Sequence, residues 1–196
     1  MAQADPFPKN ALQEIISDMA DWLEATELTS VGVRIASTPL SIWDIRSGAS
    51  LNEAATDSGE WHHQLRNTEG AFAFARSRVL DDHAEIIELA ESPLATTIES
   101  TLGSLRDAAE DSTILRLLRS ARHHTICLWL HKKDAADEVI VLQSQALRIG
   151  ERLDEHSFLA RLGTLPGSGM TSASPRYRTV PVWGPNRAQP VRQPEA

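Results

Sequence analysis

The chain of 196 residues has an ordinary globular composition, with 41% hydrophobic residues, 23% charged residues and a net charge of -8. That length supports one domain with a sizeable core, and the acidic balance argues against a surface built to bind nucleic acid or an anionic membrane. A single cysteine excludes an internal disulfide and a cysteine-based zinc cluster. No apolar run approaches the roughly 20 residues of a membrane-spanning helix, and the N-terminus lacks a secretory signal, so we expect a cytoplasmic protein.

The first predicted element is an amphipathic helix over residues 9–25. Its apolar residues recur with helical spacing; they are Leu12, Ile15, Ile16, Met19 and Leu23. The period then changes to two, which predicts a strand over residues 30–35. After a turn at Thr38 and Pro39 the same period predicts a return strand over residues 40–46.

Residues 47–59 are polar and bounded by glycine-containing turns, so we expect a long loop, and such loops are often functional or mobile. Residues 61–66 and 71–78 form a hairpin around the turn at 67–70, because the turn residues and strand lengths fit. The second of these strands places its two phenylalanines on one face and its alanines on the other. The small-residue face predicts a closely packed helix.

Residues 85–89 fit a helix or a strand, and we favour a strand because Ser92 and Pro93 then begin a helix as its N-cap and first residue. That helix extends to about Ala109. Strands over residues 114–118, 124–131 and 138–142 and a short helix over 154–162 complete the pattern. The elements predict a single α+β domain over residues 9–162, whose mixed, mostly antiparallel sheet packs against two main helices on one face.

From Gly163 the composition changes, and residues 163–196 hold six of the ten prolines together with Gly, Ser and Thr. Four arginines against one glutamate give residues 164–196 a net charge of +3, which leaves -11 on the rest of the chain. A segment so poor in apolar residues cannot offset its ordering entropy, so we expect a flexible basic tail.

Within this tail, polar and apolar residues alternate around Tyr177, as in segments that add to a partner's sheet edge or lie in a groove. The residues expected to bind a partner are Tyr177, Arg178, Val180, Val182 and Trp183. A passive solubilising tail and a tail docked on its own domain are the alternatives.

The histidines form two adjacent pairs, His62–His63 and His123–His124, and neighbouring strand residues face opposite ways. A metal site built from His63, His124 and His131 conflicts with this alternation, because His124 and His131 have opposite parity along one strand. No H-E-x-x-H or H-x-H spacing is present. We therefore expect no metal site and assign the histidines to surface or edge positions.

The other candidate residues also favour a structural role over a catalytic or cofactor-binding one. Cys127 lies mid-strand among apolar neighbours, which favours a buried, inert thiol over a nucleophile. Ser168 lacks the flanking glycines of a nucleophile elbow, and no glycine-rich phosphate loop is present, so we expect no cofactor. A set of carboxylates reads as a solvated acidic edge rather than an acid–base pair: Asp81, Asp82, Glu85, Glu88 and Glu91.

One basic stretch flanks the most apolar strand and consists of Arg116, Arg119, Arg122, His123, Lys132 and Lys133. It either holds an anion or prevents edge-to-edge pairing, and we favour the second reading.

Together these features predict a non-enzymatic cytoplasmic interaction or accessory protein that binds a protein partner through its C-terminal tail or its sheet edge. The alternatives are a small hydrolase using histidines and acids near residues 47–59, and a nucleic-acid accessory protein binding through the basic tail. No membrane, metal or cofactor partner is expected, and the oligomeric state does not follow from the sequence.

Overall fold

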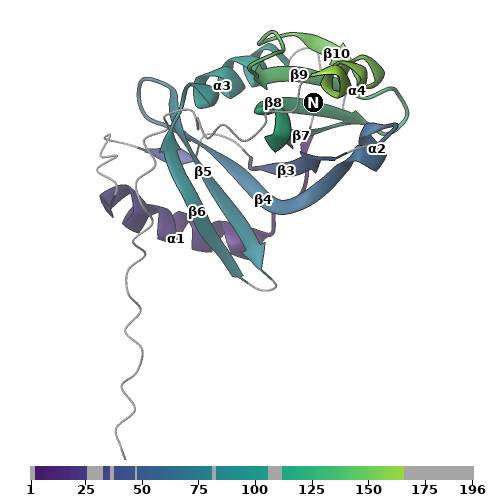
Figure 1. The fold of residues 1–196 in the computed structure, drawn as a ribbon. Coiled ribbons are helices and arrows are strands. Elements are labelled where there is room, and N and C mark those ends of the chain that lie inside the picture. Colours follow the sequence, from purple (N-terminus) through teal and green to yellow (C-terminus); the bar gives the residue numbers. More distant parts are fainter. Residues whose placement is uncertain are drawn as a thin grey trace, which may run out of the picture.

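The computed structural model describes residues 3–25, 33–35, 38–46, 48–80, 83–105 and 112–165. In these ranges ten strands form one mixed sheet with helices on both faces (Figure 1). The strand order is β10-β9-β8-β7-β3-β4-β5-β6, and the short strands β1 and β2 pair with β7 and β4. The predicted single α+β domain is confirmed.

The elements in chain order are β1 Gln3–Ala4, α1 Lys9–Ala25, β2 Arg34–Ile35, β3 Leu40–Ile45, α2 Leu51–Ala54, β4 Ala55–Arg66, β5 Ala71–Leu80, β6 His83–Glu91, α3 Pro93–Leu105, β7 Thr113–Ser120, a 3-10 turn Ala121–His123, β8 Thr125–Lys132, β9 Glu138–Gln143, β10 Arg152–Asp154 and α4 Glu155–Thr164. Among the described strands, β7 pairs in parallel with β1 and with β3. The remaining strand pairs are antiparallel.

The sheet curves around α3, which lies on what we call the inner face. This helix contacts both β5 and β9, although these strands stand far apart in the strand order. Leu94 and Ile98 of α3 pack against Leu40, Ile42 and Leu128 in one apolar cluster. Curvature therefore brings two distant parts of the sheet onto one helix.

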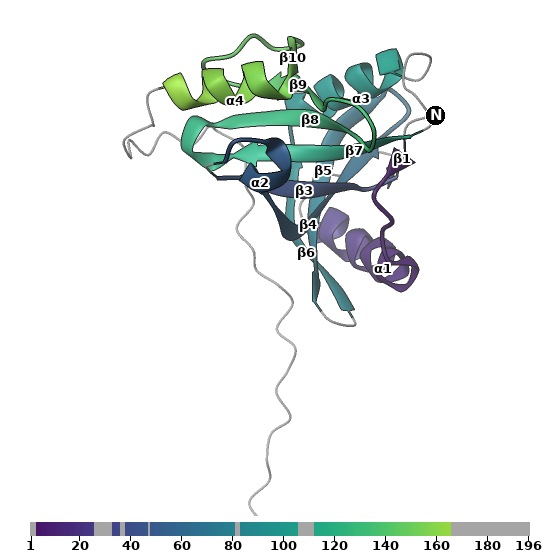
Figure 2. The same cartoon turned by 90° about the vertical axis from the view of Figure 1, so that its right-hand side faces the viewer.

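The outer face carries α1 and α4, which lie at opposite ends of the sheet in Figures 1 and 2. Ile15 and Met19 of α1 pack against Ala73 and Ala75 of β5. Both alanines are fully buried. The strand that α1 contacts most is the neighbouring β6, so the predicted close packing of a helix on the alanine face is met only in part. At the other end, Phe158 of α4 packs in a cluster that also holds Trp129 and Cys127.

The expectation of both main helices on one face is wrong, because α1 and α3 lie on opposite faces. The alternation of β4 shows this directly: Leu65 is buried in the α1 cluster, while the neighbouring Gln64 donates a hydrogen bond to the carbonyl of Ala95 in α3. Periodicity defines the two faces of a strand but does not assign a helix to either.

Residues 47–59 do not form one loop. In the described part of this range, α2 covers Leu51–Ala54 and β4 begins at Ala55, which pairs with Ile45 of β3. Leu51 and Ala54 are fully buried, because residues three apart on a helical turn reach the same side. The polar residues around them hid this pattern.

The other predicted strands and helix ends agree with the structure in part. Residues 85–89 are part of a strand, β6, and the Ser92 hydroxyl accepts a hydrogen bond from the backbone N–H of Leu94 at the start of α3. His124 adopts a left-handed conformation with φ of 46°, so β8 begins one residue later than predicted. Only Arg34 and Ile35 of the predicted strand over 30–35 are in a described strand, and β10 was missed.

Several predictions fall on residues that the structure does not describe. These include the end of the helix predicted to reach Ala109 and the tail beyond Leu165, with Tyr177, Arg178, Val180, Val182 and Trp183. In the part of the chain that is described, no helix is both long and apolar enough to cross a membrane.

Candidate functional site

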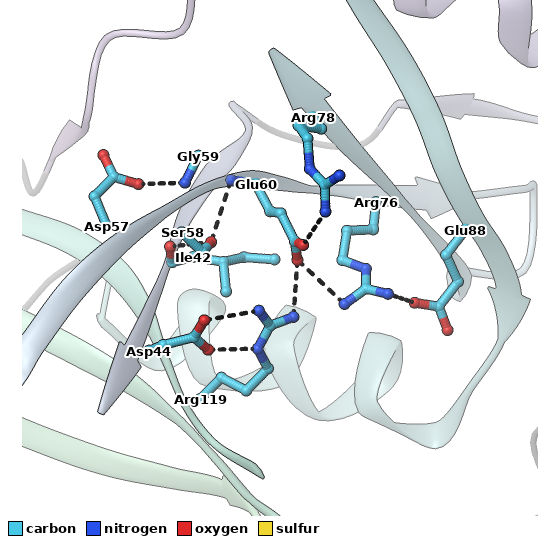
Figure 3. A network of polar contacts seen from close by, with 10 residues as sticks. All are labelled: Ile42, Asp44, Asp57, Ser58, Gly59, Glu60, Arg76, Arg78, Glu88 and Arg119. Atoms are coloured by element: carbon cyan, nitrogen blue, oxygen red, sulfur yellow. Dashed lines mark hydrogen bonds and ion pairs between the residues drawn. The ribbon is translucent and has the colours of Figure 1, made fainter. Parts of the chain in front are cut away.

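Glu60 on β4 is the centre of a network of charged side chains on the inner face (Figure 3). Its carboxylate accepts hydrogen bonds from Arg119 at 2.8 Å, from Arg76 at 3.2 Å and from Arg78 at 3.0 Å. The Glu60 side chain is only 9% exposed. Three guanidinium groups therefore converge on one largely buried carboxylate.

The network extends across five neighbouring strands. Arg119 on β7 also donates from Nε and Nη2 to the carboxylate of Asp44 on β3, at 2.7 and 3.1 Å. Arg76 on β5 reaches Glu88 on β6 at 2.8 Å. The continuous chain from Asp44 to Glu88 connects β7, β3, β4, β5 and β6, and its arginines and carboxylates balance in charge.

Glu60 and Arg119, at the centre of the network, are both held in their charged forms. Burial by itself raises the pKa of Glu60, but hydrogen bonds from Arg119 and Arg78 and the nearby charges of Arg119 and Arg76 hold that pKa below its ordinary value. The hydrogen bond to Asp44, together with that to Glu60, outweighs burial and raises the pKa of Arg119. A general acid or base needs a pKa near the working pH, so the network fits a role in fixing strands rather than in proton transfer.

The network ends at β6, the last strand in the order, which pairs only with β5 among the described strands. The backbone N–H of Ala84 points to the side of β6 away from β5, where it donates to Glu14 of α1 at 2.8 Å. Alternate residues of a strand direct their N–H groups to the same side. The N–H of Ile86 therefore points to this free side as well.

Carboxylates from two elements surround the free edge of β6. Glu85 and Glu91 on the strand are exposed. On α1, Asp18 and Asp21 lie four and seven residues beyond Glu14, so they share its flank of the helix. Of the predicted acidic edge, Asp81 and Asp82 lie outside the described residues, and Glu88 is paired with Arg76 rather than solvated.

The adjacent histidines His62 and His63 are both buried, so their assignment to surface or edge positions is wrong. They face opposite sides of the sheet, as strand alternation predicts. His62 stacks on Phe74 and lies 3.1 Å from Oε1 of Gln64, whereas His63 lies 2.7 Å from Oγ of Ser77. Burial lowers the pKa of His62 to about 4 and that of His63 to about 3.

The His63–Ser77 pair has the composition of a nucleophile and its base, but not the surroundings. Both residues have no exposed surface, and the ring of Phe7 lies edge-on to His63 at 5.3 Å. Nδ1 of His63 is buried without a hydrogen-bond partner, whereas a catalytic base is oriented by a third group and its nucleophile is accessible. The pair is a buried hydrogen bond.

The other candidate groups are also accounted for. Cys127 is buried, which raises the pKa of its thiol to about 12, and this fits the predicted inert thiol. Nδ1 of His131 lies 3.1 Å from the buried Asp137. Across the described ranges, no three His, Cys, Asp or Glu side chains are placed to hold a metal ion, so His63, His124 and His131 do not form a site.

Three side chains of the basic stretch make internal ion pairs. Arg119 binds Asp44 and Glu60, and Arg116 binds Asp5 through Nε at 2.9 Å. Lys132 binds Glu138 on β9 at 2.7 Å. Carboxylates of the chain itself therefore occupy the positions at which an anion would bind these three side chains.

Glu60, Arg76 and Arg78 are not among the candidates that the sequence indicates, because their pairing depends on an irregularity of the β4–β5 hairpin. The turn at residues 67–70 pairs Arg66 with Ala71, and an unbroken register from there would place Ser77 opposite Glu60. A register shift between Arg66 and Leu65 instead places Arg78 directly opposite Glu60. Two arginines at alternate positions of β5 therefore share a face with Glu60.

Comparison of the chain with protein-family models, with curated proteins and with solved structures gave no match.

Proposed function

We propose that this protein is a non-enzymatic binding protein that accepts an extended, basic segment of a partner protein along the free edge of β6. The observation that carries the proposal is the edge itself. It is nine residues long, it has strand pairing on one side only among the described strands, and it is surrounded by carboxylates.

A strand of this kind offers the two components of recognition by strand addition. Its outward N–H and C=O groups supply affinity for any extended backbone, and the side chains around it supply selectivity. Glu85 and Glu91 on β6, with Glu14 and Asp18 on α1, attract lysine and arginine and repel acidic segments. The Glu88–Arg76 ion pair fixes the edge strand to its neighbour.

Charge on an edge strand can also serve to prevent pairing with other chains. β6 has two of the usual protective devices: a register shift between Ile86 and Glu88, and the helix α1 beside Ala84. It is neither short nor does it contain proline or lysine, so the part beyond Ala84 remains available to an extended segment. The carboxylates of β6 repel a second copy of the same acidic edge, so they select against self-association while leaving a basic segment favoured.

The remaining parts of the predicted function stay proposals. The C-terminal residues Tyr177, Arg178, Val180, Val182 and Trp183 are a second candidate contact for a partner, and they lie outside the described residues. We also retain the cytoplasmic, accessory role as a proposal. The proposal does not extend to a hydrolase, because Ser77 and His63 are covered and Glu60 is held ionised.

The test uses the full chain and a short synthetic peptide in which lysine alternates with valine and threonine. We expect binding at low salt, and slower amide exchange at Ile86 when the peptide is bound. A peptide of the same sequence with N-methyl groups on alternate residues keeps its charge but loses the hydrogen bonds of one edge. It should bind at least about tenfold more weakly, and equal binding of the two peptides would remove strand addition as the mode.

Charge variants locate the binding site. Glu85→Lys with Glu91→Lys should weaken peptide binding about tenfold or more, because two attractions become repulsions. Glu53→Lys with Asp134→Lys is the matched control, since it makes the same change of net charge at two exposed residues, one in α2 and one in the turn after β8. Equal weakening by both double variants would show attraction to the whole acidic surface and overturn the assignment to this edge.

A further inference from the structure

The N-terminal residues fill a place in the sheet beside the first half of β7. β3 pairs in parallel with β7 only at Leu117–Arg119. Ahead of it, β1 pairs in parallel with β7 at Ile114 and Leu115. We call this place, opposite Ile114–Arg116, the β7 slot. The backbone of Gln3 and Ala4 occupies it.

Asp5, directly after β1, fixes this segment by its carboxylate. The carboxylate accepts hydrogen bonds from Nε of Arg116 at 2.9 Å and from Nη2 at 3.2 Å, and a third from the hydroxyl of Ser41. The side chains of Arg116 and Asp5 are 14% and 17% exposed. A two-pronged, largely covered arginine–carboxylate pair is among the more specific polar contacts in proteins.

Arg116 is held in place independently of Asp5. Its guanidinium carbon lies 4.4 Å from the ring centre of Trp43 and 5.0 Å from that of Trp129. Trp129 is fully buried and donates its indole N–H to Asp137 at 2.8 Å. Cation–π contact with two rings preorganises the guanidinium for a planar carboxylate.

Beyond Asp5 the chain runs down to α1, as Figure 2 shows. On the way, the ring of Phe7 packs edge-on against Trp61 at 4.9 Å. We call residues 3–8 the N-terminal strap. Its described contacts are a two-residue backbone ladder, the Asp5 carboxylate on Arg116 and Ser41, and the Phe7 ring on Trp61 and His63. Only the ladder and the carboxylate hold the part that lies in the β7 slot.

We propose that the β7 slot is a binding site for an extended acidic segment of a partner protein, and that the N-terminal strap is its built-in occupant. The strap shows which chemistry the slot accepts. A small apolar residue, here Ala4, packs toward the inner cluster, and the next residue presents a carboxylate to Arg116 and Ser41 on the outer face. Backbone pairing with Ile114 and Leu115 supplies the rest.

Exchange of the occupant is favourable because few contacts must open. Local opening of a short terminal strand costs much less than global unfolding, and a segment that reproduces the same contacts replaces what is lost. The β7 slot selects acidic segments through Arg116, whereas the edge of β6 selects basic ones. This inference therefore stands independently of the proposed function. An acidic peptide tests the β7 slot and is repelled by the edge of β6, and a basic peptide tests the edge of β6 and is repelled by Arg116.

The experiment uses the full chain and a fluorescent peptide with the sequence of residues 1–8. Asp5→Asn weakens the built-in occupant, so we expect this variant to bind the peptide at least about tenfold more tightly than the unaltered protein. Asp134→Asn, the same chemical change in an exposed turn, should leave peptide binding unchanged. A peptide with asparagine in place of its aspartate should bind the Asp5→Asn variant about tenfold more weakly or worse.

Amide exchange of the unaltered protein gives an independent readout that needs no variant to fold. At saturating peptide, exchange at residues 3–5 should accelerate while Ile114 and Leu115 stay protected, because one strand replaces the other. Unchanged exchange at residues 3–5, or equal binding of the aspartate and asparagine peptides, would overturn the proposal. Adding Arg116→Gln to Asp5→Asn should abolish binding, and retained binding would place the peptide elsewhere.

Discussion

Nη1 of Arg119 lies 2.8 Å from Oε2 of Glu60, although the two residues are 59 positions apart and a whole strand, β3, separates β7 from β4. The same guanidinium binds Asp44 on the intervening strand. One side chain thus fixes three strands relative to each other. Its position depends on the order of the strands and on no local sequence pattern.

Glu60→Gln should destabilise the protein by about 3–5 kcal/mol, because it removes the charge that balances three arginines in a largely buried place. Urea unfolding at pH 7 measures this change. Glu88→Gln is the matched control at the more exposed end of the network, where the side chain is 23% exposed, and should cost about 1 kcal/mol or less. Similar losses in both variants would contradict the central role of Glu60.

The carboxylates predict a loss of stability in acid. The pKa values of Glu60 and Asp5 are held below their ordinary values of 4.5 and 3.8 in the folded protein, in both cases by hydrogen bonds that outweigh burial. Their contribution is therefore complete above about pH 4.5 and is lost as the pH falls through the lowered values. Unfolding measured from pH 5 to pH 2.5 should show this fall. Glu60→Gln should reduce the dependence of the free energy of unfolding on pH in this range. An unchanged dependence would contradict the contribution assigned to Glu60.

The two buried histidines predict a separate loss that begins at higher pH. Their pKa values in the folded protein are about 4 for His62 and about 3 for His63, whereas an unfolded histidine titrates near pH 6.5. Below pH 6.5 these histidines are protonated in the unfolded chain but stay neutral in the folded protein. The free energy of unfolding therefore falls by about 1.4 kcal/mol per pH unit for each histidine as the pH decreases. His63→Gln should remove one such contribution between pH 6 and 4.5. His156→Gln, at an exposed position, should change nothing.

Cys127 should resist alkylation in the folded protein. Its thiol is buried, and burial raises its pKa to about 12, so very little thiolate exists at pH 8. Iodoacetamide followed by intact-mass measurement should show no adduct without denaturant and one adduct in urea above the unfolding midpoint. Rapid labelling of the native protein would contradict the burial of Cys127 in the cluster that also holds Phe158 and Trp129.

The elements with a clear period were predictable from the sequence. The α1 helix, the hairpin of β4 and β5, and the strands β7 to β9 each bury a face that repeats every two or 3.6 residues. The short α2 was hidden because one helical turn is too brief to show a period, and the three-residue β10 was hidden for the same reason.

The candidate sites depended on relationships that local patterns do not contain. The pairing of Glu60 with Arg78 requires the register shift between Arg66 and Leu65, and that of Glu60 with Arg119 requires the order β7-β3-β4. No pattern in the sequence of the N-terminal strap predicts that it joins the sheet. Its contact with Arg116 arises from a place in the sheet formed by residues more than a hundred positions away.

The parallel pairing of β3 with β7 divides the sheet into two meanders, β3 to β6 and β7 to β10, in each of which consecutive strands are neighbours. Each meander forms through contacts close in sequence, which are fast to make, whereas the join between them brings together residues 75 positions apart. Closing that long connection is the slow step expected in folding. Arg119, which binds Asp44 and Glu60 across the join, is then a residue whose replacement lowers the folding rate as well as the final stability.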